Sequence, residues 1–511
     1  MKIFKLLLLQ FILAFLFDLD AKAHTIKQGG NAIDTTSIIF TGKISDLKDA
    51  SNLSGESTLH IYVSNLPLSF IEMTAAPHRE FVIKYTEGEI FKIKVPKVGK
   101  INYVYISYPT PLNKPIPPSV DWLDNIYIAI AGDSINCQLG ANTRRFSGKG
   151  AEKFNLQQRL YELRYIGPLG LYQKIRDKNT IIQGLNELDF KCDSVYQIQK
   201  QVIEGYKDSV DQSTVNVMTA SCIGTRYYGL LRTLTTLKDQ YPIIVGSDFY
   251  KKIGTQADGI ATTDLLQSPV YYNIILQKLR LESDLNILEL CKTAQLKRLF
   301  HERYKLITER YTGSVKDKLV ALLVLGSPGE GPRVLPQLID NIHDKYYKEP
   351  LTVIMNLKKK GRDFSNYEVT DKEGRTVSFS EFNKKVVLLD FWYTGCIGCA
   401  KLNQSLAPIY EIYKDNPAVQ FVSVSTDRTF DIWQKGVRSG IYTHENSMNL
   451  YTGDLSTRHP IITENMIVSY PQFYILKNGM IWNATPPKPR GPMDLTTIKE
   501  LRVLIDTALN E

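Results

Sequence analysis

Two cysteines, Cys396 and Cys399, lie three residues apart in the segment DFWYTGCIGCAKL, residues 390–402. They follow a run of strand-forming residues. A helix that begins at Cys396 would stabilise a thiolate there through its N-terminal N–H groups, and the spacing would place both sulfurs on one helix face. The pattern favours a redox dithiol, with Cys396 as the exposed nucleophile and Cys399 as the inward-facing resolving thiol.

A metal-binding site is the main alternative for this pair, and it would need two further Cys or His ligands at suitable spacing. His444 and His459 are the only histidines in the last 150 residues, and they lie fifteen apart. The sequence therefore predicts neither a metal nor another cofactor. The four remaining cysteines are scattered, and we expect buried thiols, with a Cys192–Cys222 bridge as the main exception; they are Cys137, Cys192, Cys222 and Cys291.

Two further residues could assist such a dithiol. Asp390 ends an otherwise apolar run and could take the proton of Cys399, although a solvent-facing acid at a strand end is an equally simple interpretation. Pro471 follows Tyr470 at the start of a strand-like run. A cis bond there would expose backbone groups that pair with an extended peptide, whereas an ordinary edge strand would also tolerate the proline.

The elements that must position these residues form an α/β pattern over residues 361–511. It begins with two short strands joined by a KEG turn and continues with the buried strand KKVVLLDFWY and a helix over about 396–414. A strand VQFVSVSTD, a helical or irregular region to about 465, a strand with a turn at Asn478-Gly479 and a helix from about Leu495 complete it. Strands that alternate with helices predict a sheet covered by helices on both faces.

Two regions with other sequence patterns precede this domain. Residues 37–148 alternate apolar and polar side chains in short runs, which predicts a β-sandwich-like domain of antiparallel strands. Residues 152–355 carry long amphipathic stretches and one strong breaker, GSPGEGP, which predicts a helical domain. With 511 residues, the chain is long enough for these three domains.

The first residues predict export. MKIFK is a basic start, LLLLQFILAFLF an apolar core and AKA a small-residue cleavage site, so we expect a signal peptide over residues 1–23. The predicted location is the periplasm or cell envelope, and no membrane contact is indicated after cleavage. The net charge of +9 is small for this length and forms no block, which argues against a nucleic-acid partner.

The segments VVLLDFWYTGCIGCAKL, VQFVSVSTD and IVSYPQFYILKNGMI together resemble the thioredoxin fold, and more narrowly the exported thiol-disulfide oxidoreductases of the TlpA/ResA kind. The resemblance covers residues 361–511. It implies Cys396 as nucleophile, Cys399 as resolving thiol, Asp390 as the buried acid and Pro471 as the cis proline. We add Tyr470 and Trp392 as candidate substrate-binding residues.

The resemblance also implies an enzyme that exchanges disulfides with envelope proteins and that a redox partner protein regenerates. Gly395 replaces the usual Trp before the first cysteine, and Ile397-Gly398 replaces the usual Gly-Pro between the two. Because these residues help set the reduction potential, the direction of electron flow stays open.

A thiol peroxidase is disfavoured because the proline of its motif is missing. The alternative from another class is an envelope binding or scaffold protein in which the upstream residues act.

Overall fold

The computed structural model describes residues 37–45, 58–68, 76, 78–84, 86, 88–108, 126–140, 144–163, 169–234, 237–253, 259–290, 296–327, 329–489 and 491–511. The predicted signal peptide, residues 1–23, and Cys291 lie outside these residues. The chain forms two compact units. One comprises His78–Leu230, Ser247–Ile274 and the described residues before Phe70, and the other is mainly Ile275–Glu511.

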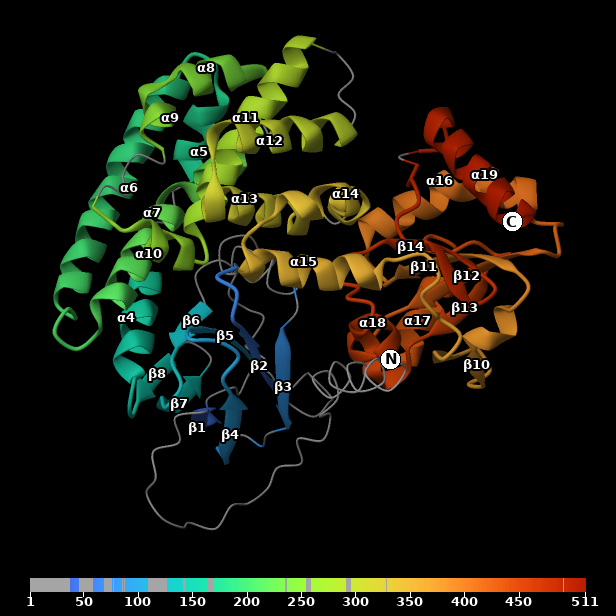
Figure 1. Ribbon diagram of the computed structural model, residues 1–511, viewed down its shortest axis with the longest axis horizontal. Coiled ribbons are helices and arrows are strands. Elements are labelled where there is room, and N and C mark those ends of the chain that lie inside the picture. The colour runs from blue at the N-terminus through green and yellow to red at the C-terminus, as the bar shows by residue number, and fades with distance from the viewer. Residues whose placement is uncertain are drawn as a thin grey trace, which may run out of the picture. The chain divides into compact units, whose positions relative to one another are not determined.

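Two four-stranded sheets open the first unit, with the strand orders β4-β1-β7-β8 and β3-β2-β5-β6 (Figure 1). Their strands are β1 (Ser37–Ser45), β2 (Thr58–Ser64), β3 (Arg79–Lys84), β4 (Ile90–Pro96), β5 (Asn102–Ser107), β6 (Ile126–Ala129), β7 (Ser134–Gly140) and β8 (Arg144–Ser147). Alternate side chains of both sheets enter one hydrophobic core, which includes Phe40, Ile61, Val104 and Ile135. This shared core explains the period of two in the sequence.

One pairing differs from the antiparallel arrangement that the sequence predicts. Strand β1 pairs with β7 in parallel register, while the other pairs of these two sheets are antiparallel. Parallel neighbours need a long connection, and here the intervening residues supply the whole second sheet. The alternation of apolar residues fixes which face of a strand is buried, but it does not fix the direction of its neighbour.

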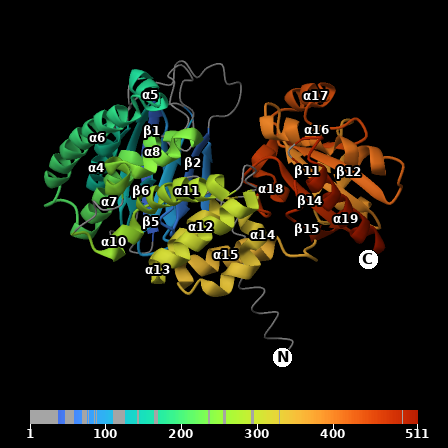
Figure 2. The same ribbon diagram turned by 90° about the horizontal axis from the view of Figure 1, so that it is seen from above.

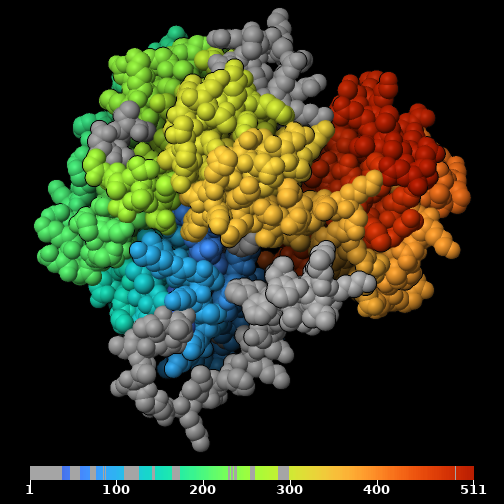
Figure 3. All heavy atoms as spheres, in the orientation of Figure 1, coloured from blue at the N-terminus to red at the C-terminus, as the bar shows by residue number. Residues whose placement is uncertain are grey.

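Most of the described residues between 151 and 357 are helical, as the amphipathic stretches predict. They are α4 (Ala151–Glu162), α5 (Leu169–Arg176), α6 (Ile181–Glu204), α7 (Gln212–Leu234), α8 (Tyr241–Gly246), α9 (Asp248–Lys252), α10 (Thr262–Gln267), α11 (Tyr271–Leu290), α12 (Leu296–Arg310), α13 (Gly313–Leu325), α14 (Gly331–Leu338) and α15 (Lys345–Leu357). The predicted breaker, residues 326–332, follows the last residue of α13 and includes the first two residues of α14. Figures 1 and 2 show α13, α14 and α15 side by side, and their side chains form a continuous surface in Figure 3.

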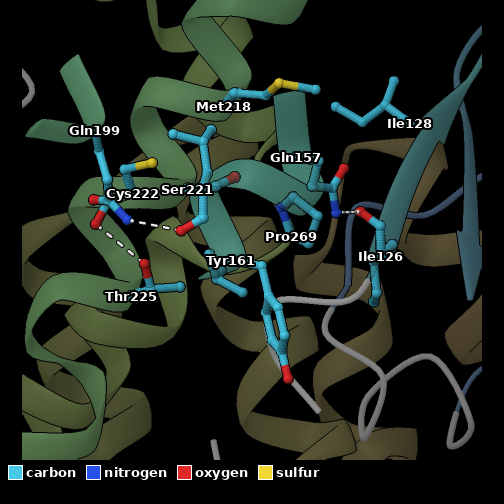
Figure 4. A pocket seen from close by; sticks show the side chains of 12 residues that line it. Ile126, Ile128, Gln157, Tyr161, Gln199, Met218, Ser221, Cys222, Thr225 and Pro269 are labelled. Carbon is cyan, nitrogen blue, oxygen red and sulfur yellow. Dashed lines mark hydrogen bonds between the residues drawn. The ribbon is translucent and has the colours of Figure 1, made fainter. Parts of the chain in front are cut away.

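The scattered cysteines of the first unit are buried thiols: Cys137 on β7, Cys192 on α6 and Cys222 on α7. Within the described residues no bridge joins Cys192 to Cys222, so that exception is wrong. Cys222 lines a small pocket together with Ser221, Thr225 and residues of α4, α6 and β6 (Figure 4).

The C-terminal α/β domain is built on a seven-stranded sheet of order β10-β9-β13-β12-β11-β14-β15. The strands are β9 (Glu368–Thr370), β10 (Thr376–Ser378), β11 (Val386–Trp392), β12 (Val419–Ser425), β13 (Met448–Tyr451), β14 (Gln472–Lys477) and β15 (Met480–Asn483), and the helices are α16 (Ile397–Tyr413), α17 (Phe430–Arg438), α18 (Pro460–Thr463) and α19 (Leu495–Asn510). Strand β11 runs parallel to β12 and antiparallel to β14, so it lies inside the sheet.

Side chains of β11 alternate between two cores. Val386 and Leu388 pack with α16 and α19, which lie together along one side of the sheet in Figure 1, while Val387 and Leu389 pack with α18 on the opposite face. Helices therefore cover both faces, as predicted. The sequence missed β13, which is only four residues long and has no alternating pattern.

The predicted domain boundaries near residues 148 and 355 coincide with changes in the type of secondary structure. The boundary between the two compact units does not coincide with these predicted boundaries. The first unit combines both N-terminal sheets with several helices, and the second combines α12–α15 with the α/β domain. The division into 37–148, 152–355 and 361–511 stays a prediction.

Candidate active site

The cysteine pair lies where β11 passes into α16. Cys396 is the N-cap of α16, and a disulfide joins it to Cys399, with the two Cα atoms 5.2 Å apart. The backbone N–H of Cys399 donates to the sulfur of Cys396 over 3.1 Å. The same N–H also donates to the backbone carbonyl of Cys396 over 3.1 Å, so it is shared between the two acceptors. Together with the helix dipole, it can stabilise negative charge on this sulfur after reduction.

Cys396 is less exposed than the sequence suggests. Its exposed fraction is 4%, against 2% for Cys399, so both residues are buried in the disulfide form. The aromatic side chains of Trp392, Trp433 and Tyr451 pack around the pair. The exposed surface beside the disulfide comes instead from Ile397, between the cysteines, at 74% and from Tyr393 at 42%, and the sequence interpretation used neither.

Trp392 does not fit the role of a substrate-binding residue. Its side chain is fully buried, and its ring stacks on Tyr442 at a centroid distance of 5.4 Å. A docking protein therefore cannot contact it in this structure, because the last strand residue faces inward beneath α16 and α17. Tyr470 is partly buried, and its ring meets that of the exposed Tyr393 edge-on at 5.4 Å.

The loop between β11 and the cysteines is anchored by Asp427, which the sequence interpretation missed. One carboxylate oxygen accepts the backbone N–H of Thr394, and the other accepts the hydroxyls of Thr394 and Ser425, all within 2.9 Å. Gly395 follows with φ +96°, a conformation that L side chains rarely adopt. A Trp with this backbone conformation would be strained, so the loop in this form suits the glycine found here.

Asp390 lies on β11 opposite Ser423 of β12, whose hydroxyl donates to the carboxylate over 3.1 Å. The alternation of β11 places Asp390 on the face that α16 covers. The residue keeps some exposed surface, but burial of the carboxyl raises its pKa to about 7, and the Ser423 hydrogen bond only partly opposes that shift. A carboxyl with this pKa can gain or lose a proton near neutral pH.

The peptide bond between Tyr470 and Pro471 is cis, as the sequence interpretation anticipated. The proline faces the cysteine helix: a Cβ placed on Gly398 would lie 3.1 Å from Cδ of Pro471. The ammonium of Lys488 donates to the carbonyl of Pro471 over 2.7 Å. No sequence signal pointed to Lys488, because it lies seventeen residues further along the chain, outside the recognised motifs.

The two histidines of this domain have structural contacts. His444 stacks on Tyr410 at a centroid distance of 4.1 Å, and His459 accepts the backbone N–H of Ile461 at the start of α18. Across the described residues, no group of three or more His, Cys, Asp or Glu side chains is placed to hold a metal ion.

Comparison with known proteins identifies the domain that carries the cysteines. Residues 383–481 match a family model described as thioredoxin-like. The C-terminal domain is thioredoxin-like. Thiol-disulfide oxidoreductase ResA of Bacillus thuringiensis subsp. konkukian is 33% identical over 69 residues, and ResA of Bacillus anthracis is 32% identical over the same length. Each match covers 14% of this chain and 39% of the relative, so the chain spans well under half the length of these relatives.

Two solved structures are similar to the thioredoxin-like domain. The thioredoxin domain of a thiol-disulfide oxidoreductase from Bacteroides vulgatus has 24% identity and a TM-score of 0.24, and the match covers 30% of this chain and 99% of that one. A thiol:disulfide interchange protein from a Bacteroides species has 28% identity and a TM-score of 0.23, over 28% of this chain and 90% of its own. Among the described helices, none combines the length and apolarity that a membrane crossing requires.

Proposed function

We propose that this protein is an exported thiol-disulfide oxidoreductase that exchanges disulfides with proteins of the cell envelope. The observation that carries the proposal is the Cys396–Cys399 disulfide at the start of α16, opposite the cis proline Pro471. The signal peptide that the sequence predicts over residues 1–23 supports the location. The two N-terminal sheets serve as a β-sandwich-like accessory domain, followed by a helical domain.

Cys396 is the nucleophile of the reduced protein. Its thiolate attacks one sulfur of a partner disulfide, a mixed disulfide forms, and the other partner sulfur leaves as a thiolate. The Cys399 N–H that already donates to the Cys396 sulfur stabilises the attacking anion. Ile397, between the cysteines, and Tyr393, before them, provide the exposed apolar contacts, and the backbone beside Pro471 pairs with the extended partner.

Cys399 then resolves the mixed disulfide. Asp390, as carboxylate, accepts the proton of Cys399, and the resulting thiolate attacks the Cys396 sulfur and expels the second partner sulfur as a thiolate. Two electrons have passed to the partner, and the protein is left with its Cys396–Cys399 disulfide. A dithiol partner protein restores the reduced form. The same steps in reverse oxidise a partner dithiol, so the direction depends on the reduction potential.

Trapping the mixed disulfide tests this function. Cys399→Ser keeps the shape of the residue but removes the resolving thiol, so covalent complexes with envelope proteins should accumulate. They should appear as discrete heavier bands on non-reducing gels of envelope extracts and disappear with reductant. The matched controls are the double change Cys396→Ser with Cys399→Ser, which should give no bands, and Cys192→Ser, which changes a buried thiol outside the site.

Bands that also form in the double variant would place the reaction at another cysteine. No bands with Cys399→Ser, combined with no reductase or oxidase turnover of the wild type, would favour the scaffold function. A redox titration of the full chain gives the direction: a potential near about −270 mV indicates a reductase, and one near about −120 mV indicates an oxidase.

A further inference from the structure

A basic face forms the solvent side of the sheet of order β4-β1-β7-β8 (Figure 1). The other side of this sheet lies in the hydrophobic core, because alternate residues of each strand point in opposite directions. The residues of the basic face are exposed on β4, β7 and β8, and exposed or half-buried on β1. They are Ile39, Thr41, Lys43 and Ser45 of β1, Ile90, Lys92, Lys94 and Pro96 of β4, Ser134, Asn136 and Gln138 of β7, and Arg145 and Ser147 of β8. This set contains four cations and no acid.

The register of the strands brings these cations close together. Lys92 of β4 pairs with Thr41 of β1, so it is a diagonal neighbour of Lys43. On the other side of β1, Lys43 is level with Gln138 of β7, which pairs with Arg145 of β8. With strands about 4.8 Å apart and alternate residues about 7 Å apart, the Cα atoms of Lys43 and Arg145 lie about 10 Å apart, and all the cations lie within about 20 Å.

Neighbouring side chains do not neutralise these charges. In the part of the chain that the structure describes, no carboxylate forms an ion pair with Lys43, Lys92 or Arg145. Of the described acids that flank the four strands, Asp133 is buried and paired with another lysine, and Glu89 lies in the turn before β4. Like charges on neighbouring positions of a sheet lower its stability. An anion that covered the basic face would remove this cost.

Protection of the sheet edge explains only part of the arrangement. Lysines on an edge strand such as β4 prevent that strand from pairing with a second sheet. Lys43, however, lies on β1, which is paired on one side with β4 and on the other with β7. The cations therefore extend across the sheet from one edge strand to the other.

We propose that the basic face binds an acidic polysaccharide, whose carboxylate or sulfate groups pair with Lys43, Lys92 and Arg145. An open face that crosses several strands suits a linear polymer, and the charges of the two are complementary. Between the cations, Thr41 and Gln138 offer side chains that can hydrogen-bond the uncharged hydroxyls of a sugar. None of the side chains of the basic face is aromatic, so it lacks the groups on which single-stranded nucleic acids stack. The proposal does not depend on the oxidoreductase activity.

Binding of the full chain to immobilised polygalacturonate tests the site, and neutral dextran is the uncharged comparison. Surface plasmon resonance measures both affinities. Polygalacturonate should bind and dextran should not, because only the first carries carboxylates. Raising the NaCl concentration from about 50 to about 300 mM should weaken binding at least about tenfold, since salt screens exposed charges. No binding of polygalacturonate at about 50 mM NaCl, or equal binding of dextran, would overturn the proposal.

Variants of the basic face separate its charge from its hydrogen-bonding groups. The combined change Lys43→Gln, Lys92→Gln and Arg145→Gln should weaken polygalacturonate binding at least about tenfold. Gln138→Ala keeps every charge and should weaken it about threefold, because a hydrogen bond to the sugar is lost. If the combined variant does not fold, Lys43→Gln alone decides, with an expected loss of about threefold. Wild-type affinity in the combined variant, or in Lys43→Gln where that decides, would overturn the proposal.

The matched control removes the same number of exposed cations outside the sheet, through Lys178→Gln, Lys345→Gln and Lys499→Gln. Its affinity should change by less than about twofold. An equal loss in both combined variants would show that only the net charge of the chain matters. Tighter binding to vesicles of phosphatidylglycerol and phosphatidylcholine than to polygalacturonate would assign the basic face to a membrane surface. Either result would overturn the proposal, whereas disulfide turnover should be unchanged in both variants.

Discussion

The N-terminal β region and the C-terminal α/β domain each contain a buried cysteine and an aspartate with a buried carboxyl group, yet the surroundings of these residues differ between the two regions. Cys137, on β7, lies in the shared hydrophobic core, and burial raises its pKa to about 12. Cys396 is as buried, but it lies at a helix start where a backbone N–H meets its sulfur. Burial alone makes a thiol inert, and the local dipoles decide whether it can react.

The buried aspartates repeat this contrast. Asp133, before β7, forms an ion pair with Lys153 at 3.0 Å and accepts the backbone N–H of Ile130. Asp390 has Ser423 as its hydrogen-bond partner, and burial raises its pKa to about 7. The first carboxylate holds a turn and a helix together, whereas the second keeps a proton that it can exchange.

The comparison of thiols predicts the largest effect. In the reduced protein, Cys396 should react with limited iodoacetamide at least about a thousandfold faster than Cys137 or Cys192, because a thiol of pKa about 12 is almost entirely protonated near neutral pH. Mass mapping of the labelled peptides measures the ratio. Faster labelling of Cys399 than of Cys396 would reverse their assigned roles, and equal labelling of Cys137 would remove the contrast.

Substitution by Asn should change the stability of the fold in opposite directions at Asp390 and at Asp133. The folded pKa of Asp390 is raised above its unfolded value of 3.8, so its contribution to stability is complete below about pH 3.8 and is lost as the pH rises to about 7. Asp390→Asn should therefore stabilise the fold by about 2–4 kcal/mol above pH 7 and have little effect below pH 3.8. Denaturant unfolding across this pH range gives the difference.

Asp133→Asn is the matched comparison for that substitution. It leaves the Lys153 ammonium buried without its partner, so it should destabilise the fold by about 3–5 kcal/mol near neutral pH. Two changes of the same sign would show that burial, and not pairing, controls both carboxyls.

The proposed proton transfer predicts a smaller effect on rate. Asp390→Asn should slow resolution of the mixed disulfide by about 10- to 100-fold near neutral pH, since the amide cannot accept the Cys399 proton. The attack by Cys396 should change little. Rapid-mixing turnover with a model disulfide separates the two steps. A variant that matches the wild type over about pH 6–9 would leave Asp390 with a structural role only.

The smallest expected effect is the loss of stability when alanine replaces either of two glycines that have a similar backbone conformation. Gly395→Ala should cost about 1–2 kcal/mol of stability, because φ is +96° but a Cβ there meets no atom within 4 Å. Gly148→Ala, at φ +97°, should cost more, because the Cβ would lie 2.3 Å from the carbonyl oxygen of Ser134. Thermal unfolding of both variants tests the order, and equal losses would contradict it.

The sequence was most informative where local pattern decides structure. The apolar run of β11, the start of α16 at Cys396 and the turn at Asn478 and Gly479 were all predicted, since periodicity, helix capping and turn chemistry act over a few residues. The cis bond before Pro471 also agrees with the structure.

The remaining features depend on distant partners. The parallel pairing of β1 with β7, the short strand β13 and the anchoring of Thr394 by Asp427 join residues that lie far apart in the chain. The full burial of Trp392 was missed for the same reason, since Tyr442 and α17 cover it. Local patterns in a single sequence do not indicate which distant residues come into contact.

The exposed Ile397 has a kinetic consequence for the proposed exchange. Its side chain is 74% exposed between the two cysteines, and a partner that covers it would bury most of that area. Full burial of such a side chain contributes about 1.5–3 kcal/mol, and gains of this kind mostly slow dissociation. The residence time of an encounter complex would then lengthen by about one to two orders of magnitude, which gives Cys396 more time to attack before the partner departs.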